Sequence, residues 1–102
     1  MLVAFSVAPS GTGRNDGSVH DAVAAAVRIV RDSGLPHRTT SMFTEIEGEW
    51  DDVMDVVKRA TEAVGHYGSR VSLVLKADIR PGYTGELEAK IDRLERAIDE
   101  TE

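Results

Sequence analysis

The stretch from Val71 to Ile79 constrains the fold more than any other part of the chain, because it alternates with a period of two. Its apolar or small side chains are Val71, Leu73, Leu75, Ala77 and Ile79, and they alternate with Ser72, Val74, Lys76 and Asp78. Successive side chains of a β-strand point to opposite faces of the sheet, which produces this period. The pattern predicts a strand here, and any fold for the chain must include it.

Three further strands are expected before this one. Leu2–Ala8 is apolar and small with strand formers at alternate positions, and Pro9 is expected to close it because proline cannot donate a ladder hydrogen bond. His37–Ser41 and Met42–Glu47 predict two short strands, although the turn between them carries no clear signal.

Apolar residues at helical spacing predict three helices. The first carries Val19, Val23, Ala26, Val27 and Val30, the second Val53, Val57, Ala60 and Val64, and the third Leu87, Ile91, Leu94 and Ile98. Ser18 with Asp21 resembles a capping box at the first helix start, and Gly34 favours its end. The apolar seam of the third helix is narrow, so we expect it to pack on another surface, of its own domain or of a neighbouring subunit.

The order strand, helix, strand, strand, helix, strand, helix predicts one domain over residues 1–102. Right-handed crossovers arrange two β-α-β halves as a ferredoxin-like fold of the α/β class, more narrowly α+β, with a βαββαβ order and an additional C-terminal helix. Its four-stranded antiparallel sheet has helices on one face. Candidates for the open, partly apolar face are Ser6, Ala8, Thr44, Ile46, Val74 and Lys76.

Charge and cysteine content exclude several classes of protein. The chain carries 18 acidic and 12 basic residues, a formal net charge of -6 that repels nucleic acid and anionic membrane surfaces. It has no cysteine, which fits a reducing compartment and excludes disulfides and thiolate metal sites. The segment Leu2–Ala8 is too short for a signal peptide and has no basic residue before it. We therefore expect a cytoplasmic protein.

No local motif predicts catalysis or metal binding. The loop Gly11-Thr12-Gly13 matches neither dinucleotide-binding nor P-loop patterns, so a plain connection is favoured over a phosphate site. His20, His37 and His66 are scattered without metal-ligand spacing. No signature ties a nucleophile to a base. The sequence predicts neither an enzyme nor a protein with a resident cofactor.

The segment from Thr44 to Trp50 is the most informative one for function. It brings the carboxylates of Glu45 and Glu47, Gly48 and the single tryptophan to the start of a helix. An aromatic surface and a hydrogen-bond acceptor can converge there on a ligand. The alternative is that Trp50 staples the helix to the sheet while the glutamates face water, and the residues alone favour neither.

Four stretches carry a resemblance to a known family. They are Phe5-Ser6-Val7-Ala8-Pro9 with Gly11-Thr12-Gly13, Ser18-Val19, Ser33-Gly34-Leu35, and Thr40 to Trp50 followed by Val53-Met54. In these the chain resembles the small thiamine-binding proteins of the MTH1187 and YkoF type, over nearly its whole length. It departs from them at Ser41, where proline is expected before the methionine.

The resemblance implies a ferredoxin-like homo-oligomer that binds thiamine or its hydroxymethylpyrimidine moiety, with no established catalytic role. The open sheet face and the seam of the last helix predict a homodimer or homotetramer. For an aminopyrimidine, Trp50 or Phe43 would supply a stacking face, and Glu47 would accept from the amino group. Hydroxyls would come from Ser6, Thr12 and Thr44. Two alternatives remain open: a structural or regulatory oligomerisation module without a ligand, and a small enzyme acting on a pyrimidine metabolite.

Overall fold

The structure is a computed structural model that describes residues 1–11 and 19–100. Its elements, in chain order, are β1 (Leu2–Ser10), α1 (Val19–Asp32), β2 (His37–Thr39), β3 (Thr44–Glu47), α2 (Trp50–Val64), a short 3₁₀ helix (Gly65–Tyr67), β4 (Arg70–Asp78) and α3 (Glu86–Glu100). The expected capping residue Ser18 and the loop residue Thr12 lie outside the described residues.

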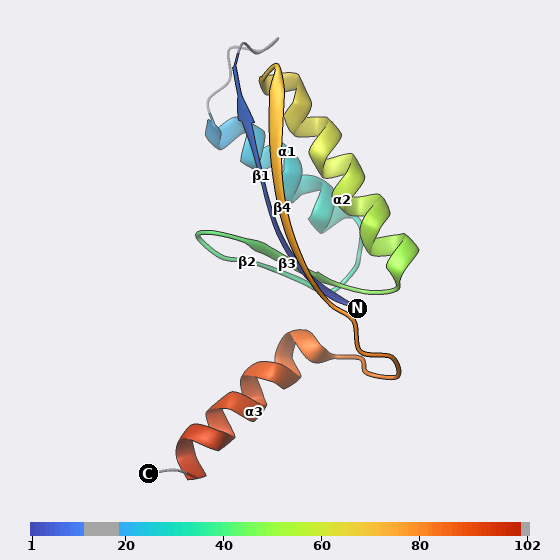
Figure 1. The fold of residues 1–102 in the computed structure, drawn as a ribbon, viewed down its shortest axis with the longest axis vertical. Coiled ribbons are helices and arrows are strands. Elements are labelled where there is room, and N and C mark those ends of the chain that lie inside the picture. Colours follow the sequence, from blue (N-terminus) through green and yellow to red (C-terminus); the bar gives the residue numbers. More distant parts are fainter. Residues whose placement is uncertain (12–18, 101–102) are drawn as a thin grey trace.

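The four strands form one antiparallel sheet in the order β2-β3-β1-β4. Helices α1 and α2 pack against each other and against β1, so both cover the same face of the sheet (Figure 1). This is the split β-α-β arrangement with a further helix, α3, after the last strand. The ferredoxin-like fold predicted from the order of elements is confirmed.

The core lies between the sheet and these two helices, and most of its side chains are valine or alanine. The buried apolar residues that form it are Val3, Phe5, Val7, Ala22, Ala26, Val30, Ile46, Val53, Val56, Val57, Ala60 and Val64. Val3, Phe5 and Val7 alternate along β1, so this strand presents one face to the helices and the other outward. The helical spacing read from the sequence identified the buried stripe of α2. In α1 it was right for Ala26 and Val30, whereas Val19 and Val23 are exposed and Ala22 is buried in their place.

The register of β3 corrects the predicted composition of the open face. Val3 pairs with Ile46 and Phe5 pairs with Thr44. Residues directly opposite each other in an antiparallel pair share a face, so Ile46 and Thr44 lie on the helix-covered face rather than the open one. Ile46 is fully buried. The prediction was wrong for these two because a one-residue difference in register exchanges the faces of a strand.

The register of β1 with β4 places the other four candidates on the open face. Ser6 pairs with Val74, so both side chains lie on the same face of the sheet. Ser6 stands between the buried residues Phe5 and Val7 in β1, so that face is the open one. Ala8 and Lys76 occupy the same face two residues away along each strand. This part of the expected open surface is confirmed.

Strand β1 continues through Pro9 to Ser10, two residues beyond the predicted end. The backbone groups of successive residues in a strand point to alternate sides, and Met1 exchanges two hydrogen bonds with Gly48 on the β3 side. Pro9 therefore points its nitrogen to the β3 side, whereas the pairing of β1 with β3 stops at Phe5. The missing N–H costs no ladder bond with β4, so Pro9 does not end the strand.

Strands β2 and β3 are shorter than predicted because residues 40–43 form the turn between them. The Thr40 backbone N–H donates to the Phe43 carbonyl at 2.9 Å, and the Phe43 N–H donates to Thr40 Oγ1 at 3.2 Å. Met42 and Phe43 therefore project from a turn and not from a strand. This turn closes a hairpin at the edge of the sheet beside α1.

Helix α3 extends away from the sheet and the other two helices (Figure 1). Of its predicted seam, Leu87 is buried, whereas Ile91, Leu94 and Ile98 are exposed. Within the protomer, only the first residue of the seam is therefore buried. Among the described residues, no helix is long and apolar enough to cross a membrane.

Candidate functional site

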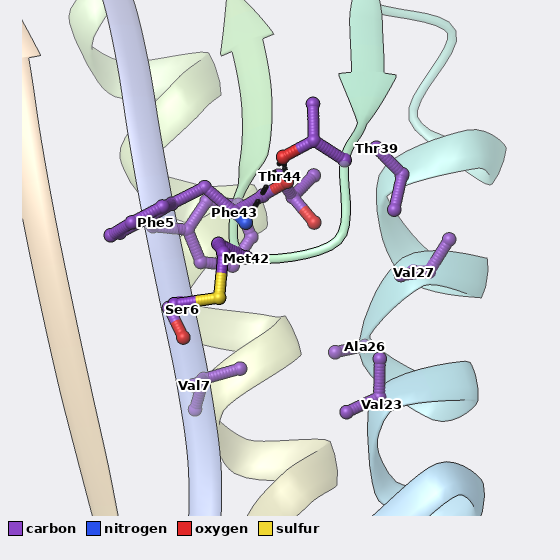
Figure 2. A pocket seen from close by; sticks show the side chains of 11 residues that line it. Phe5, Ser6, Val7, Val23, Ala26, Val27, Thr39, Met42, Phe43 and Thr44 are labelled. Carbon is purple, nitrogen blue, oxygen red and sulfur yellow. Dashed lines mark hydrogen bonds between the residues drawn. The ribbon is translucent and has the colours of Figure 1, made fainter.

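A pocket opens between β1, α1 and the turn that joins β2 to β3 (Figure 2). Its volume is about 80 Å³. Its lining residues are Phe5, Ser6, Val7, Val23, Ala26, Val27, Thr39, Thr40, Met42, Phe43 and Thr44. It occupies the space beside β1 where β3 no longer pairs with that strand.

The pocket combines apolar walls with threonine hydroxyls. Valine and alanine side chains of α1 form one wall, and Val7 of β1 stands opposite them (Figure 2). Thr39 and Thr44 pair across β2 and β3, so both side chains lie on the helix-covered face. The Thr40 hydroxyl is already used, since it donates to the Phe43 carbonyl at 3.0 Å. Among the described residues, the side chains of Thr39 and Thr44 have no hydrogen-bond partner, so these two threonine hydroxyls remain for another partner, in addition to that of Ser6.

Two large side chains stand at the mouth of this pocket. Met42 is 74% exposed and Phe43 is 36% exposed, although both are apolar. Both come from the turn, whose backbone is held by Thr40. An aromatic ring and a thioether at the rim of an apolar pocket give a flat ligand a surface to stack against.

Three of the six predicted ligand-binding residues meet in this pocket. Phe43 and Thr44 line it from the hairpin, and Ser6 lines it from β1. Ser6 pairs with Val74, so its side chain lies on the open face of the sheet. It therefore lines the pocket at the edge of β1 and not from the helix-covered face. Thr12 lies outside the described residues. Glu47 and Trp50 lie elsewhere.

The carboxylate of Glu47 binds the start of α3. It is 6% exposed and accepts hydrogen bonds from the backbone N–H groups of Glu86, at 2.9 Å, and Leu87, at 3.2 Å. These N–H groups belong to the first turn of a helix, where no intrahelical acceptor exists and a negative charge is stabilised. Glu47 therefore acts as a capping group supplied by a distant strand.

Packed side chains fill one side of Gly48, although both Glu47 and Gly48 also line a larger cleft described below. A Cβ atom at Gly48 would lie 3.2 Å from Val53 Cγ2 and 3.4 Å from both δ-carbons of Leu35. Val53 and Leu35 therefore occupy the space into which a side chain at position 48 would project. Trp50 is 54% exposed and lines a separate hollow with residues 79–84, so it does not staple α2 to the sheet.

A larger cleft of about 520 Å³ lies at the opposite end of β1, under the loop before α3. Its walls come from Met1 and from residues within 35–37, 47–52 and 83–88, so no local pattern predicted it, although the predicted ligand-binding residue Glu47 is one of its lining residues. Its polar lining includes Glu49, Asp52 and Tyr83, and the Arg80 guanidinium lies 3.7 Å from the centre of the Tyr83 ring. Within residues 1–11 and 19–100, no group of three histidine or acidic side chains is arranged to hold a metal ion.

Ion pairs complete the attachment of α3. Arg38 pairs with Glu88, and Lys90 pairs with Asp78 at the end of β4. The hydrogen bond and the charge of Lys90 hold the pKa of the Asp78 carboxyl below its ordinary value. These exposed pairs orient α3, while the buried carboxylate of Glu47 supplies the stronger contact.

Relatives match nearly the whole length of the chain. A UPF0045 protein of Mycobacterium bovis is 52% identical over 99 residues, which cover 96% of this chain and 94% of that protein. A hypothetical protein of Methanocaldococcus jannascii has a solved structure that superposes with a TM-score of 0.79 at 28% identity, covering 91% of this chain and 93% of that one.

A second solved structure is of a protein whose name refers to thiamine. It is a candidate thiamine biosynthesis or salvage protein of Thermotoga maritima, with a TM-score of 0.71 and 26% identity, covering 87% of this chain and 94% of that chain. The family model described as thiamine-binding protein matches residues 3–95. The resemblance seen in the sequence is thereby confirmed, and this chain belongs to the thiamine-binding protein family.

Proposed function

We propose that this protein binds thiamine through its hydroxymethylpyrimidine moiety, without catalysis, in the pocket between β1, α1 and the β2–β3 turn. The observation that carries the proposal is a small pocket with apolar walls, free threonine hydroxyls and an aromatic rim in a member of the thiamine-binding family. The cytoplasmic location and the homodimer or homotetramer expected from the sequence belong to the same proposal.

The size of the pocket favours one ring of the ligand. Its volume of about 80 Å³ is well below the roughly 300 Å³ at which pockets begin to enclose drug-sized ligands. A pyrimidine ring with its small substituents is the part of thiamine that matches this space. The thiazolium would remain at the rim near Met42 and Phe43, and its positive charge suits a protein whose net charge is -6.

The lining residues suggest a role for each part of the pocket. Val23 and Val27 would contact one face of the ring, and Phe43 would stack on it at the rim. Thr39 and Thr44 would hydrogen bond to ring nitrogens or to the hydroxymethyl group, since each hydroxyl donates and accepts. Ser6 lies at the strand edge of the same pocket. Ligand binding by Thr12, Glu47 and Trp50 stays a prediction.

Calorimetry with thiamine, free hydroxymethylpyrimidine and the free thiazole tests the proposal. We expect thiamine and the pyrimidine to bind and the thiazole alone to bind at least roughly tenfold more weakly, because only the pyrimidine enters the pocket. The ligand should also raise the melting temperature, since it binds the folded state.

A pair of variants in α1 shows whether binding uses this pocket. Val23 is 42% exposed and lines the pocket, so Val23→Phe fills it at little cost to folding. Ala24 is exposed on the same helix and does not line the pocket, so Ala24→Phe is the control. Val23→Phe should weaken binding by roughly a hundredfold or more and Ala24→Phe should not change it.

Three results would contradict the proposal. Absence of binding by all three compounds would favour an oligomerisation module without a ligand. Equal binding by both variants would move the site away from this pocket. Conversion of the pyrimidine to a new product by the purified protein would favour an enzyme.

A further inference from the structure

The backbone N–H and C=O groups of Val7, in β1, point toward the pocket instead of toward a neighbouring strand. Met1 forms two hydrogen bonds with Gly48, the residue that follows β3. The Met1 amino group donates to the Gly48 carbonyl, and the Gly48 N–H donates to the Met1 carbonyl. The Glu47 N–H donates to Pro36 on the opposite side, so alternate residues of β3 face β1 and β2. The same alternation turns the N–H and C=O of Val3, Phe5 and Val7 toward β3.

Strand β3 reaches only the first two of these residues. Its pairing with β1 ends at Phe5 and Thr44. The next partner in register, Met42, lies in the turn. Apart from the strand ladders, no backbone hydrogen bond between described residues involves Val7. Val7 is only 8% exposed and lines the pocket.

A backbone donor and acceptor at such a position need a partner, because buried N–H and C=O groups are almost always paired. Another strand is an unsuitable partner. The next residue facing the same side is Pro9, which has no N–H, and a strand added here would lose that ladder bond. The edge therefore offers one donor–acceptor pair in a pocket of ring size, which suits a small planar ligand.

We propose that the backbone N–H and C=O of Val7 recognise the amino-substituted edge of the pyrimidine. This inference rests on the function proposed above and deepens it. The amino group of the ligand donates to the Val7 carbonyl, and the adjacent ring nitrogen accepts from the Val7 N–H. Val7 thus determines ligand specificity through its main chain. The residue type at this position therefore does not reveal the role in the sequence.

The proposal makes selection depend on the order of donor and acceptor along one edge of the ring. An aminopyrimidine places a donor beside an acceptor and matches the Val7 pair. An oxo-pyrimidine places a carbonyl acceptor beside a protonated ring nitrogen. Its carbonyl faces the Val7 carbonyl and its N–H faces the Val7 N–H, so neither hydrogen bond forms. A ring without the amino group leaves the buried carbonyl unpaired.

Calorimetry on the wild-type protein with three probes tests this order. The probes are hydroxymethylpyrimidine, its analogue with hydrogen in place of the amino group, and its analogue with an oxo group there. We expect the hydrogen analogue to bind about tenfold to a hundredfold more weakly, and the oxo analogue more weakly still, by at least about a hundredfold.

Amide exchange measured by NMR assigns the effect to Val7. Saturation with hydroxymethylpyrimidine should slow exchange of the Val7 amide at least roughly tenfold, because the amide gains an acceptor. The Phe5 amide is already paired with Thr44 and is the control. If the three probes bind equally, or if Val7 exchange does not slow in the saturated protein, the assignment to Val7 is wrong while the proposed function stands. If no probe binds, the proposed function fails with it.

Discussion

Replacing Glu47 by glutamine should loosen α3 from the domain. The carboxylate accepts from two backbone N–H groups of the first helical turn, at 2.9 and 3.2 Å, and it is almost completely buried. Glutamine keeps the shape, but its amide nitrogen cannot accept, so one N–H loses its partner. The negative charge at the helix start is lost as well.

The size of the effect follows from these contacts. A hydrogen bond to a charged group contributes about 1.5–3 kcal/mol, and a carboxylate near a helix start about 0.3–1 kcal/mol. Both figures describe the same contact and are not summed. We therefore expect Glu47→Gln to weaken the docking of α3 by about 2 kcal/mol, a factor of roughly thirty in the equilibrium between docked and undocked helix.

Hydrogen exchange at the Leu87 amide measures this equilibrium directly, because that amide is one of the two donors. Its exchange should accelerate about thirtyfold in Glu47→Gln. Glu45 lies two residues earlier on the same face, is half-buried, and makes no side-chain hydrogen bond among the described residues, so Glu45→Gln is the matched control. Equal exchange rates in the two variants would refute the capping role of Glu47.

Three further variants test other contacts. Leu94→Asp should dissociate the proposed homo-oligomer while leaving the melting temperature of the protomer unchanged, because Leu94 is exposed in the protomer. An unchanged mass by light scattering would show that the seam is not an interface. Lys90→Gln should raise the pKa of the Asp78 carboxyl toward its ordinary value in an NMR titration. In the wild type the lowered pKa makes this ion pair stabilising above the ordinary aspartate pKa, and its contribution disappears as the pH falls through the folded value. Gly68→Ala should lower the free energy of unfolding in urea by about 3 kcal/mol or more, since the new Cβ would lie 2.5 Å from a main-chain oxygen of β1. Gly34→Ala, at a position with φ +76 and open space, should lower it by about 1–2 kcal/mol. Similar losses in the two variants would show that the backbone at Gly68 adjusts freely.

Local patterns were sufficient to predict the helices and the order of the strands. The stripes of α1 and α2 depend on spacing within one segment, and the alternation from Val71 onward depends on one strand. The faces of β3 depend instead on its register with β1, a strand distant in sequence. Because no local pattern specifies such a register, Thr44 and Ile46 were assigned to the wrong face.

The candidate site was predicted in part, at two residues of the hairpin and one of β1. Phe43 and Thr44 are close in sequence and also close in the pocket, together with Ser6. Glu47 was singled out as a carboxylate near a helix start, but the helix it caps begins 39 residues later and not at the next element. Contacts at such a separation leave no local pattern.

The valine-rich wall of α1 has a consequence for how the pocket adapts to ligands. A β-branched side chain on a helix has essentially one χ1 rotamer, so Val23 and Val27 lose little conformational entropy on contact and cannot reshape to admit a bulkier ring. Met42, which is 74% exposed, has three rotatable bonds and can follow different groups at the rim. For the proposed ligand, we therefore expect the interior of the pocket to discriminate between rings and the rim to tolerate variation in the groups attached to the ring.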